Sequence, residues 1–444
     1  MPVATVASRG RTSGRFSMRF RSDDPLAGAR RGDLHAPLAA VTGRRAPALV
    51  GLLALGAVVT LAAVAAGWPA GSPPPDHSSS SPASTPPPAG SPVLPEDWAW
   101  TRADEAVFDG SNSVHDLSSD GRTLVALGQA CERNESGLTG PCWGVTWTLE
   151  DEVWSRPVPV GADRSANFNA ILIDGETRLV ASSGGSSSVW AWRGSLGWQP
   201  IADQAPFAPE ADGGPTGAGL PEAFLGAEIA ALAGGPAGFV AVGRVSCGQC
   251  GMGDRAAVWL SADGEAWQRL PYEPPFKEGS MWDLTRFGDE LIVVGVGIWR
   301  SPDGLAWERI RGAGGLLSSV TVGGPGLVAV GYDGSNGTLA GVSTDGLEWQ
   351  SVAIEPGNGV SLEGVASSAY GLFAVGRPIG PDRGLIWWSA DGFDWHLLDT
   401  GGTFADAILR DVVAHRDAIY VSGTVRNGYP DQAGAVWVGR PGGP

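Results

Sequence analysis

Seven residues of this 444-residue sequence have side chains of the types that bind or cleave ligands. Each lies at or next to an equivalent position of a sequence pattern that repeats along the chain. Arginines bind carboxylates through paired hydrogen bonds. Cleavage of a glycosidic bond needs two carboxyl groups, or a tyrosine nucleophile helped by an acid, with further groups that anchor the substrate. If these side chains converge in the fold, they could bind a ligand or cleave a glycosidic bond. If they do not, they are ordinary solvated charges at the rim of the domain. The residues are His115, Arg244, Trp282, Tyr332, Glu363, Arg377 and Arg410.

The most regular of the elements that must position them is the pattern Ser-x-Asp-Gly-x-x-Trp, which occurs four times. Asp-Gly between two apolar runs is a strong hairpin signal, because Gly accepts the positive φ of a tight turn and the Asp carboxylate accepts backbone N–H groups. The Trp can cover the turn and pack against a neighbouring hairpin. Each copy therefore predicts a strand, a turn and a strand. The copies are Ser261, Asp263, Gly264, Trp267; Ser301, Asp303, Gly304, Trp307; Ser343, Asp345, Gly346, Trp349; and Ser389, Asp391, Gly392, Trp395.

This pattern resembles the Asp-box, or BNR repeat, of sialidase-like β-propellers. The resemblance implies that the box is a structural turn remote from the functional site. It also implies that the connections between second and third strands, and those between blades, open on the opposite face. A sialidase-like enzyme would have three arginines converging on a substrate carboxylate, for which Arg244, Arg377 and Arg410 are the candidates. It would also have an early Arg-Ile-Pro type segment, which this sequence lacks.

A second repeated element sets the period of the chain. Short apolar strands end at Gly128, Gly243, Gly295, Gly331, Gly376 and Gly423, and a weaker one, RLVASS, ends at Ser183. Each follows another apolar strand across a tight turn and precedes a Trp-containing hairpin. Units of four strands and about 35 to 45 residues are typical of propeller blades. The sequence therefore predicts an all-β, seven-bladed β-propeller over residues 96–444, with six or eight blades as alternatives.

The last unit lacks its fourth strand, because Trp437 has no partner before the chain ends. The segment Ala99-Trp100-Thr101-Arg102 matches the fourth strand of other units and has no blade of its own. We expect it to complete the seventh blade, which would remove two open sheet edges.

The four cysteines fall in two equivalent loops, with Cys131 and Cys142 in one and Cys247 and Cys250 in the other. Outside the cytoplasm, such pairs most often form disulfides. A zinc or redox site at Cys247-Gly-Gln-Cys250 is the alternative, but the sequence has no second ligand pair and no nearby His to support it. We expect no metal and no cofactor.

The chain before the repeats divides into three segments. Residues 1–45 carry nine Arg against three Asp and read as a disordered cytoplasmic arm; residues 46–68 are uncharged and long enough to span a bilayer. Residues 69–95 are rich in Pro and Ser and predict an extended stalk with a reach of roughly 80 Å. The alternative for the apolar run is a cleaved signal peptide.

These segments predict a single-pass membrane protein with a cytoplasmic amino terminus and an extracytoplasmic propeller. The formal net charge is −17, and the basic residues concentrate in the arm, so the propeller is acidic and nucleic acid is not an expected partner. We expect a monomeric, non-catalytic module that binds an extracellular glycan or protein. The alternative is a sialidase-like glycoside hydrolase that acts on extracellular glycans.

Overall fold

The computed structural model describes residues 92–133, 139–161, 167–183, 188–202, 204, 227–245, 254–271, 274–277, 279–312, 314–335, 337–380, 383–426 and 432–442. They all belong to the compact unit Pro74–Pro444. The predicted arm, membrane span and most of the stalk lie outside these residues. In the part of the chain that is described, no helix is long and apolar enough to cross a membrane.

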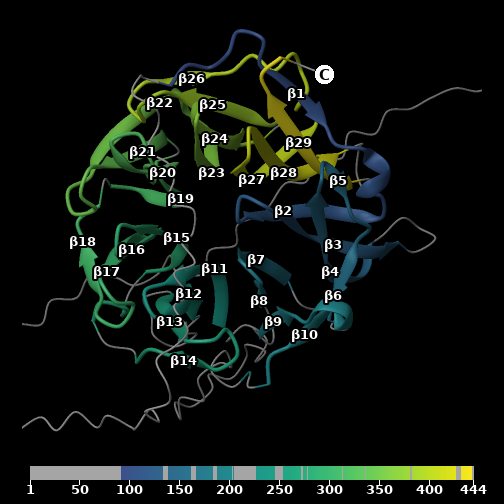
Figure 1. The fold of residues 1–444 in the computed structure, drawn as a ribbon. Helices are drawn as coiled ribbons and strands as arrows, with labels where there is room; N and C mark the ends of the chain where they lie inside the picture. Colours follow the sequence, from purple (N-terminus) through teal and green to yellow (C-terminus); the bar gives the residue numbers. More distant parts are fainter. Residues whose placement is uncertain are drawn as a thin grey trace, which may run out of the picture. The chain divides into compact units, whose positions relative to one another are not determined.

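The strands form seven antiparallel blades arranged in a ring (Figure 1). The first four blades are β2 (Ser111–Ser119), β3 (Leu124–Arg133), β4 (Thr139–Glu150) and β5 (Val153–Trp154), with β6 (Val158–Val160) also on β4; β7 (Asn167–Asp174), β8 (Thr177–Ser183), β9 (Ser188–Trp192) and β10 (Trp198–Pro200); β11 (Ala227–Gly235), β12 (Gly238–Val245), β13 (Arg255–Ser261) and β14 (Trp267–Arg269); and β15 (Met281–Phe287), β16 (Glu290–Gly295), β17 (Gly297–Ser301) and β18 (Glu308–Ile310).

The last three blades are β19 (Leu316–Gly323), β20 (Gly326–Tyr332), β21 (Gly337–Ser343) and β22 (Gln350–Asn358); β23 (Val360–Ser368), β24 (Gly371–Pro378), β25 (Leu385–Ser389) and β26 (Trp395–Leu397); and β27 (Ala407–His415), β28 (Ala418–Arg426), β29 (Gln432–Arg440) and β1 (Ala99–Arg102). Two short 3-10 helices, η1 (Glu105–Val107) and η2 (Gly194–Leu196), connect strands. The prediction of an all-β, seven-bladed propeller is confirmed.

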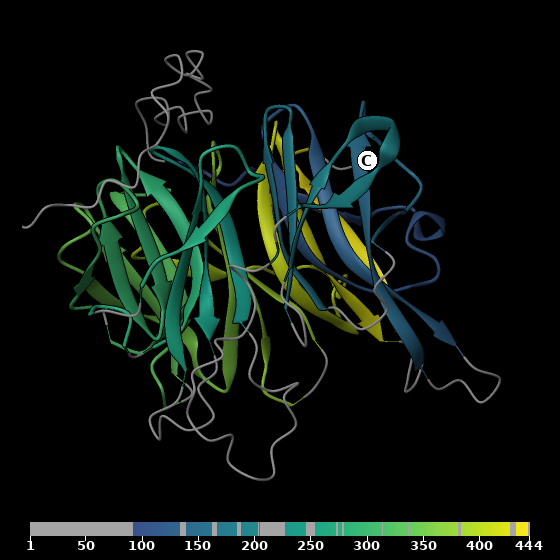
Figure 2. The ribbon, with the colours of Figure 1, turned by 90° about the horizontal axis from the view of Figure 1, so that it is seen from below.

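The antiparallel order gives the ring two chemically different faces. In every blade the strands run between the same two faces (Figure 2). The turns that follow first and third strands lie on one face, which we call the turn face. The connections between second and third strands and between blades lie on the other, which we call the loop face. Several of the longer loop-face segments lie outside the described residues.

The amino-terminal strand closes the ring, as the sequence predicts. β1 pairs with β29 in the register Ala99↔Arg440 to Arg102↔Trp437, so residues more than 330 positions apart form one ladder. The ring of Trp100 lies over Gly439, where a Cβ atom would be too close to the indole. On its other side Trp100 meets Phe373 and Phe404 edge to face. The seventh blade is thus joined to the sixth by aromatic contacts as well as by its own strands.

The hydrophobic core lies between the blades. Each of the seven clusters of buried apolar residues draws its members from two neighbouring blades. Third strands supply the largest buried side chains, including Trp147, Trp259, Trp299, Trp387 and Trp437, which are at most 1% exposed. Because a single blade cannot bury both of its faces, its stability depends on its neighbours.

The Ser-Asp-Gly-Trp turns are built as the sequence predicts, and blade four illustrates all four. The Gly304 N–H donates to Ser301 Oγ at 2.8 Å, and the N–H groups of Leu305 and Ala306 donate to Asp303 Oδ1 at 2.8 and 2.7 Å. The Trp307 indole donates to the Gly304 carbonyl at 2.7 Å. The Ala306 N–H, the largest influence, holds the pKa of Asp303 below its ordinary value. The Ser, Asp and Trp side chains thus stabilise the backbone of the turn.

We expect Asp303→Ala to lower the free energy of unfolding by about 1–2 kcal/mol, because two backbone N–H groups lose their acceptor. Asp303→Asn, which keeps an acceptor oxygen, should lose less. Chemical denaturation measures both. An Ala variant as stable as the parent, or one that stays folded but no longer binds a loop-face ligand, would contradict a purely structural role.

The cysteine prediction is confirmed for one pair. Cys131 and Cys142, which are paired residues of β3 and β4, form a disulfide. Cys247 and Cys250 lie outside the described residues.

Candidate functional site

The first strand of each blade, which we call the inner strand, has a β-bulge at the same level, near the loop face. At this level the register with the second strand skips one residue in each of β2, β7, β11, β15, β19, β23 and β27, and β2 has a second skip, at Asn112, nearer its start. A bulge leaves the extra residue unpaired and re-aims its side chain. The residues skipped at the shared level are His115, Asn169, Ala230, Trp282, Ser318, Glu363 and Arg410. Four of the seven predicted site residues are therefore bulge residues.

The bulge explains the repeated glycine of the second strand. A Cβ atom on Gly295 would overlap the carbonyl oxygen of Ser280, and one on Gly243 would overlap that of Glu228. Only glycine permits this approach of two backbones. In blade two the equivalent position is Ser182, which pairs with Phe168 just before the bulge, so the repeat ends one residue before the predicted Ser183.

In four blades the side chain of the residue after the bulge bonds to the inner strand of the next blade. In three blades it is an aspartate whose carboxylate accepts the N–H of a residue in the following inner strand, so this side chain ties two blades together and is not free to act on a ligand. The pairs are Asp116 with Ile171 at 2.7 Å, Asp283 with Val320 at 2.8 Å and Asp411 with Leu117 at 2.9 Å.

Two of these aspartates meet where the ring closes. The Leu117 N–H donates to both Asp116 Oδ1 and Asp411 Oδ2 at 2.9 Å. Burial, and then repulsion from Asp411, raises the pKa of Asp116 well above its ordinary value. Burial likewise raises the pKa of Asp411 to about 7. At neutral pH the two carboxyl groups, one from β2 and one from β27, therefore retain a proton between them.

Four predicted residues gather at the loop-face end of blades six, seven and one, together with a fifth that was not predicted. We call this set the arginine cluster: His115, Glu363, Arg377, Arg410 and Arg426. Glu363 Oε1 lies 3.5 Å from Arg377 Nε. Arg410 is exposed, yet partial desolvation lowers the pKa of its guanidinium; Glu363 opposes that shift, and Arg377 and Arg426 add to it. The guanidinium groups of Arg377 and Arg426 thus both act on that of Arg410, and Glu363 lies beside Arg377 and Arg410.

His115 contributes no positive charge to the cluster at neutral pH. Burial, and then the charge of Arg410, lowers its pKa to about 4. Its Nε2 lies 3.0 Å from Ser113 Oγ, which fixes the ring. A neutral imidazole can donate or accept one further hydrogen bond beside the arginines.

The other three predicted residues do not join this cluster. Arg244 pairs within blade three, with Glu228 Oε2 and Asp254 Oδ2 each at 2.6 Å, so its charge is matched locally. Trp282 and Tyr332 are half-buried residues of blades four and five. No contact within the described residues connects them to Arg410. The predicted convergence of Arg244, Arg377 and Arg410 is therefore limited to Arg377 and Arg410.

Arg426 could have been found from strand alternation. Arg377 follows the repeated Gly376 by one residue, and Arg426 follows Gly423 by three, so both stand on the same face of a second strand. The first position after the glycine, where Arg244, Tyr332 and Arg377 stand, is Thr424 in blade seven, so that position alone does not point to Arg426. No cluster of three His, Cys, Asp or Glu side chains with metal-binding geometry occurs among the described residues.

No protein-family model and no curated protein sequence matches this chain. Among solved structures, one described as YCF48 bound to D1 peptide aligns with 17% identity and a TM-score of 0.48 over 80% of this chain and 98% of that one. The Myceliophteria thermophila Cps50 (Swd1) β-propeller domain aligns with 13% identity and a TM-score of 0.47 over 76% of this chain and 98% of that one. The RRP9 WD40 repeats align with 11% identity and a TM-score of 0.48 over 79% of this chain and 99% of that one. The seven-bladed fold itself rests on the strand pairing described above.

Proposed function

We propose that this chain is a non-catalytic binding module that holds an acidic segment of a protein partner on the arginine cluster. The observation that carries the proposal is that Arg377 and Arg410 lie together beside Glu363, the one carboxylate that the described contacts place with these two arginines. Arg377 Nε is buried, lies 3.5 Å from Glu363 Oε1 and makes no hydrogen bond with a described residue. A carboxylate can accept two parallel hydrogen bonds from a guanidinium.

The energetics favour an anionic ligand at this position. Partly desolvated positive charges that repel one another raise the free energy of the unliganded site. A carboxylate placed among them relieves that repulsion, and its attraction is stronger here than in bulk water because the effective dielectric constant is lower. The rest of the propeller is acidic, so recognition depends on this local excess of positive charge and not on the net charge of the domain.

A glycosidase is less well supported. Such an enzyme needs two catalytic groups on either side of the scissile bond. Among the described residues of the cluster, Glu363 is the single carboxyl group, and it pairs with Arg377. Asp116 and Asp411 accept backbone N–H groups of neighbouring strands, and Tyr332 belongs to blade five.

We further propose that the propeller belongs to the Asp-box type and is displayed outside the cell on a membrane anchor formed by residues 46–68. The four Ser-Asp-Gly-Trp turns support the first part, and the uncharged run preceded by Arg44 and Arg45 supports the second. β1 is a fourth strand, so it runs from the turn face to the loop face. The stalk then joins the turn face, and the arginine cluster lies on the opposite face.

The binding proposal is tested by measuring the affinity of the full-length chain for a blocked hexaglutamate peptide. We expect Arg410→Ala and Arg377→Ala each to weaken binding about tenfold, since loss of one charge-assisted pair corresponds to ~1.4 kcal/mol. Raising the salt concentration should also weaken binding. Arg286→Ala, which removes an exposed arginine paired with Asp289, is the matched control and should bind like the parent.

A hexagalacturonate oligosaccharide offers the same carboxylates on a glycan and separates the two kinds of partner. Stronger binding of the oligosaccharide than of the peptide would replace the protein partner with a glycan. Equal affinities for the parent and both arginine variants would exclude the cluster as the binding site.

A further inference from the structure

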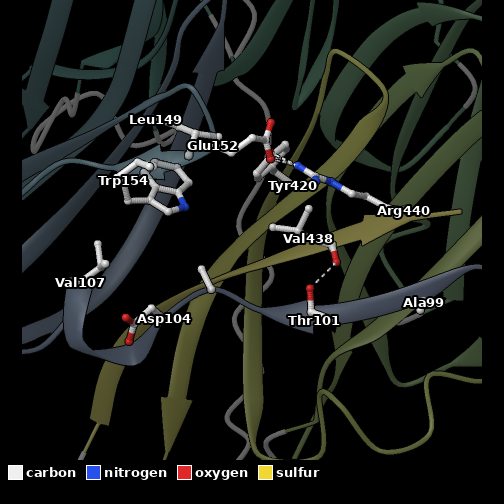
Figure 3. A pocket seen from close by; sticks show the side chains of 12 residues that line it. Ala99, Thr101, Asp104, Val107, Leu149, Glu152, Trp154, Tyr420, Val438 and Arg440 are labelled. Atoms are coloured by element: carbon white, nitrogen blue, oxygen red, sulfur yellow. Dashed lines mark hydrogen bonds and ion pairs between the residues drawn. The ribbon is translucent and has the colours of Figure 1, made fainter. Parts of the chain in front are cut away.

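A groove of ≈ 430 Å³ lies at the seam between blades seven and one (Figure 3). We call it the seam groove. One wall is a row of side chains across blade seven, Thr101, Val438 and Tyr420, which are neighbours in the strand register. The facing wall is the outer hairpin of blade one, with Leu149 and Trp154. None of the lining residues belongs to the arginine cluster.

The groove exists because blade seven lacks a large apolar side chain that blades three to six have. Three residues after the fourth-strand Trp, blades three to six place Leu270, Ile310, Val352 and Leu398, and each packs on a core cluster between blades. The equivalent residue of blade seven, three positions after Trp100, is Ala103. Two residues earlier, on the same face of the strand, blades three to six have the exposed residues Gln, Glu, Gln and His, and blade seven has the shorter Thr101. The seam between blades seven and one is therefore left unfilled.

The facing wall presents a hydrogen-bond donor without an acceptor. In blades three to six the indole N–H of the turn Trp donates to the glycine carbonyl of its own turn, at 2.7 to 3.2 Å. In blade one a two-residue turn, Asp151-Glu152, replaces that turn. Trp154 has no hydrogen bond with any described residue, and its indole edge faces the groove (Figure 3). An unpaired donor in a half-buried site favours an incoming acceptor.

The charges at the rim favour a neutral or basic ligand. At one end Arg440 pairs with Glu152 and with the Tyr420 hydroxyl, so these charges cancel. At the other end Asp104 supplies a carboxylate that is not in an ion pair with the described residues, although it caps η1 through Ala106 N–H. The outer rim is formed by Val153, whose side chain is 68% exposed.

The strand along the groove can also pair with a further strand. β1 has one neighbour, β29, in the described sheet. No described strand pairs with its second edge, and an extended peptide can add to such an edge through main-chain hydrogen bonds while side chains enter adjacent pockets.

We propose that the seam groove receives an extended segment of a protein partner, which places an apolar side chain between Val438 and Trp154. A backbone carbonyl of the segment accepts the Trp154 indole N–H, and a Lys or Arg beside the apolar residue pairs with Asp104. This site is independent of the arginine cluster and takes the opposite charge. The partner side chain occupies the space that Leu or Ile fills in the other blades.

The test selects binders from a phage-displayed library of random hexapeptides on the full-length chain. We expect enriched peptides to combine an apolar residue with a neighbouring Lys or Arg. Ala103→Leu, which installs the residue of blades three and six, should reduce their affinity at least tenfold. Ala306→Leu, on an exposed turn of blade four, is the matched control and should leave affinity unchanged.

Trp154→Phe provides a second test, which removes the indole donor but keeps an aromatic ring in the wall of the groove. Loss of the indole donor should weaken the enriched peptides about fivefold, even if Ala103→Leu disturbs the fold. Peptides that bind parent and Ala103→Leu equally, or a library without enrichment, would overturn the proposal. Binding of N-acetyl-leucine amide that Ala103→Leu abolishes, without enrichment of any peptide, would replace the protein partner with a small neutral molecule.

Discussion

A chain that begins at Asp104 should fail to form a soluble monomer, whereas one that begins at Pro92 should be monomeric and unfold cooperatively. The deletion removes β1 and leaves the outer edge of β29 unpaired over four residues. It also uncovers the aromatic contacts between blades six and seven, in which Trp98 stacks on Phe373 at 5.3 Å and meets Tyr370. An exposed strand edge beside uncovered apolar surface promotes association. Size-exclusion chromatography and thermal denaturation of the two chains measure the effect.

The single substitution Trp100→Ala separates packing from strand pairing. Trp100 is half-buried, so we expect a loss of about 2–3 kcal/mol, below the 3–5 kcal/mol of fully buried aromatic truncations. Thr101→Ala, on the other face of β1, is the control and should cost much less, because its hydroxyl makes one long bond of 3.5 Å to the Val438 carbonyl. Equal melting temperatures for the chains starting at Pro92 and Asp104 would mean that β1 does not close the ring.

Most of the fold was predictable because the same turn and strand motifs recur at a fixed period along the chain. Gly304 and Trp307 showed where each outer hairpin turns, and the unpaired Trp437 pointed to Ala99–Arg102 as the missing strand. The repeated Gly243 and Gly295 were recognised as strand ends, but the reason why glycine is required there was not. They face the bulge of the inner strand, and no one-dimensional pattern shows that two backbones approach so closely.

The site was predicted less completely, because charge pairing depends on the third dimension. Arg244 and Arg377 occupy the same position of their repeats, yet Arg244 is matched by Glu228 and Asp254 while Arg377 shares Glu363 with Arg410. Their equal positions in the sequence do not show this difference. The groove at Ala103 was not predicted either, because it becomes visible only when Ala103 is compared with the residues that fill the seams after blades three to six.

The stability of the propeller should fall as the pH rises from 6.5 to 8.5, and the cause is the shared proton of Asp116 and Asp411. Burial raises the pKa of both carboxyl groups in the folded protein, to about 7 for Asp411. In the unfolded chain both return to about 3.9. The folded state therefore binds protons that the unfolded state has lost. The resulting stabilisation is complete below about pH 4 and disappears as the pH rises through 7.

Two histidines act in the opposite direction, but at lower pH. Burial lowers the pKa of His115 to about 4 and also lowers the pKa of His415. Below about pH 6.5 the unfolded chain protonates these side chains first, which reduces stability as the pH falls. At pH 6.5 the unfolded histidines are still about half protonated, which lowers stability there by about 0.4 kcal/mol for each, and by pH 8.5 they are neutral in both states. Between pH 6.5 and 8.5 the carboxyl groups therefore make the larger contribution, and the histidines reduce the difference.

Urea denaturation at pH 6.5 and 8.5 should give a difference in the free energy of unfolding of about 1–3 kcal/mol, since each proton contributes ~1.4 kcal/mol per pH unit. The double variant Asp116→Asn, Asp411→Asn keeps acceptors for the Leu117 and Ile171 N–H groups, and it should show a smaller difference. Burial also raises the pKa of Asp283, which is unchanged in this variant. Asp303→Asn is the control: its parent carboxyl has a lowered pKa and is ionised at both pH values, so the slope should not change. If the stability of the parent is constant or rises between pH 6.5 and 8.5, the two aspartates hold no proton. The seam between blades seven and one would then contain two buried negative charges that share the Leu117 N–H.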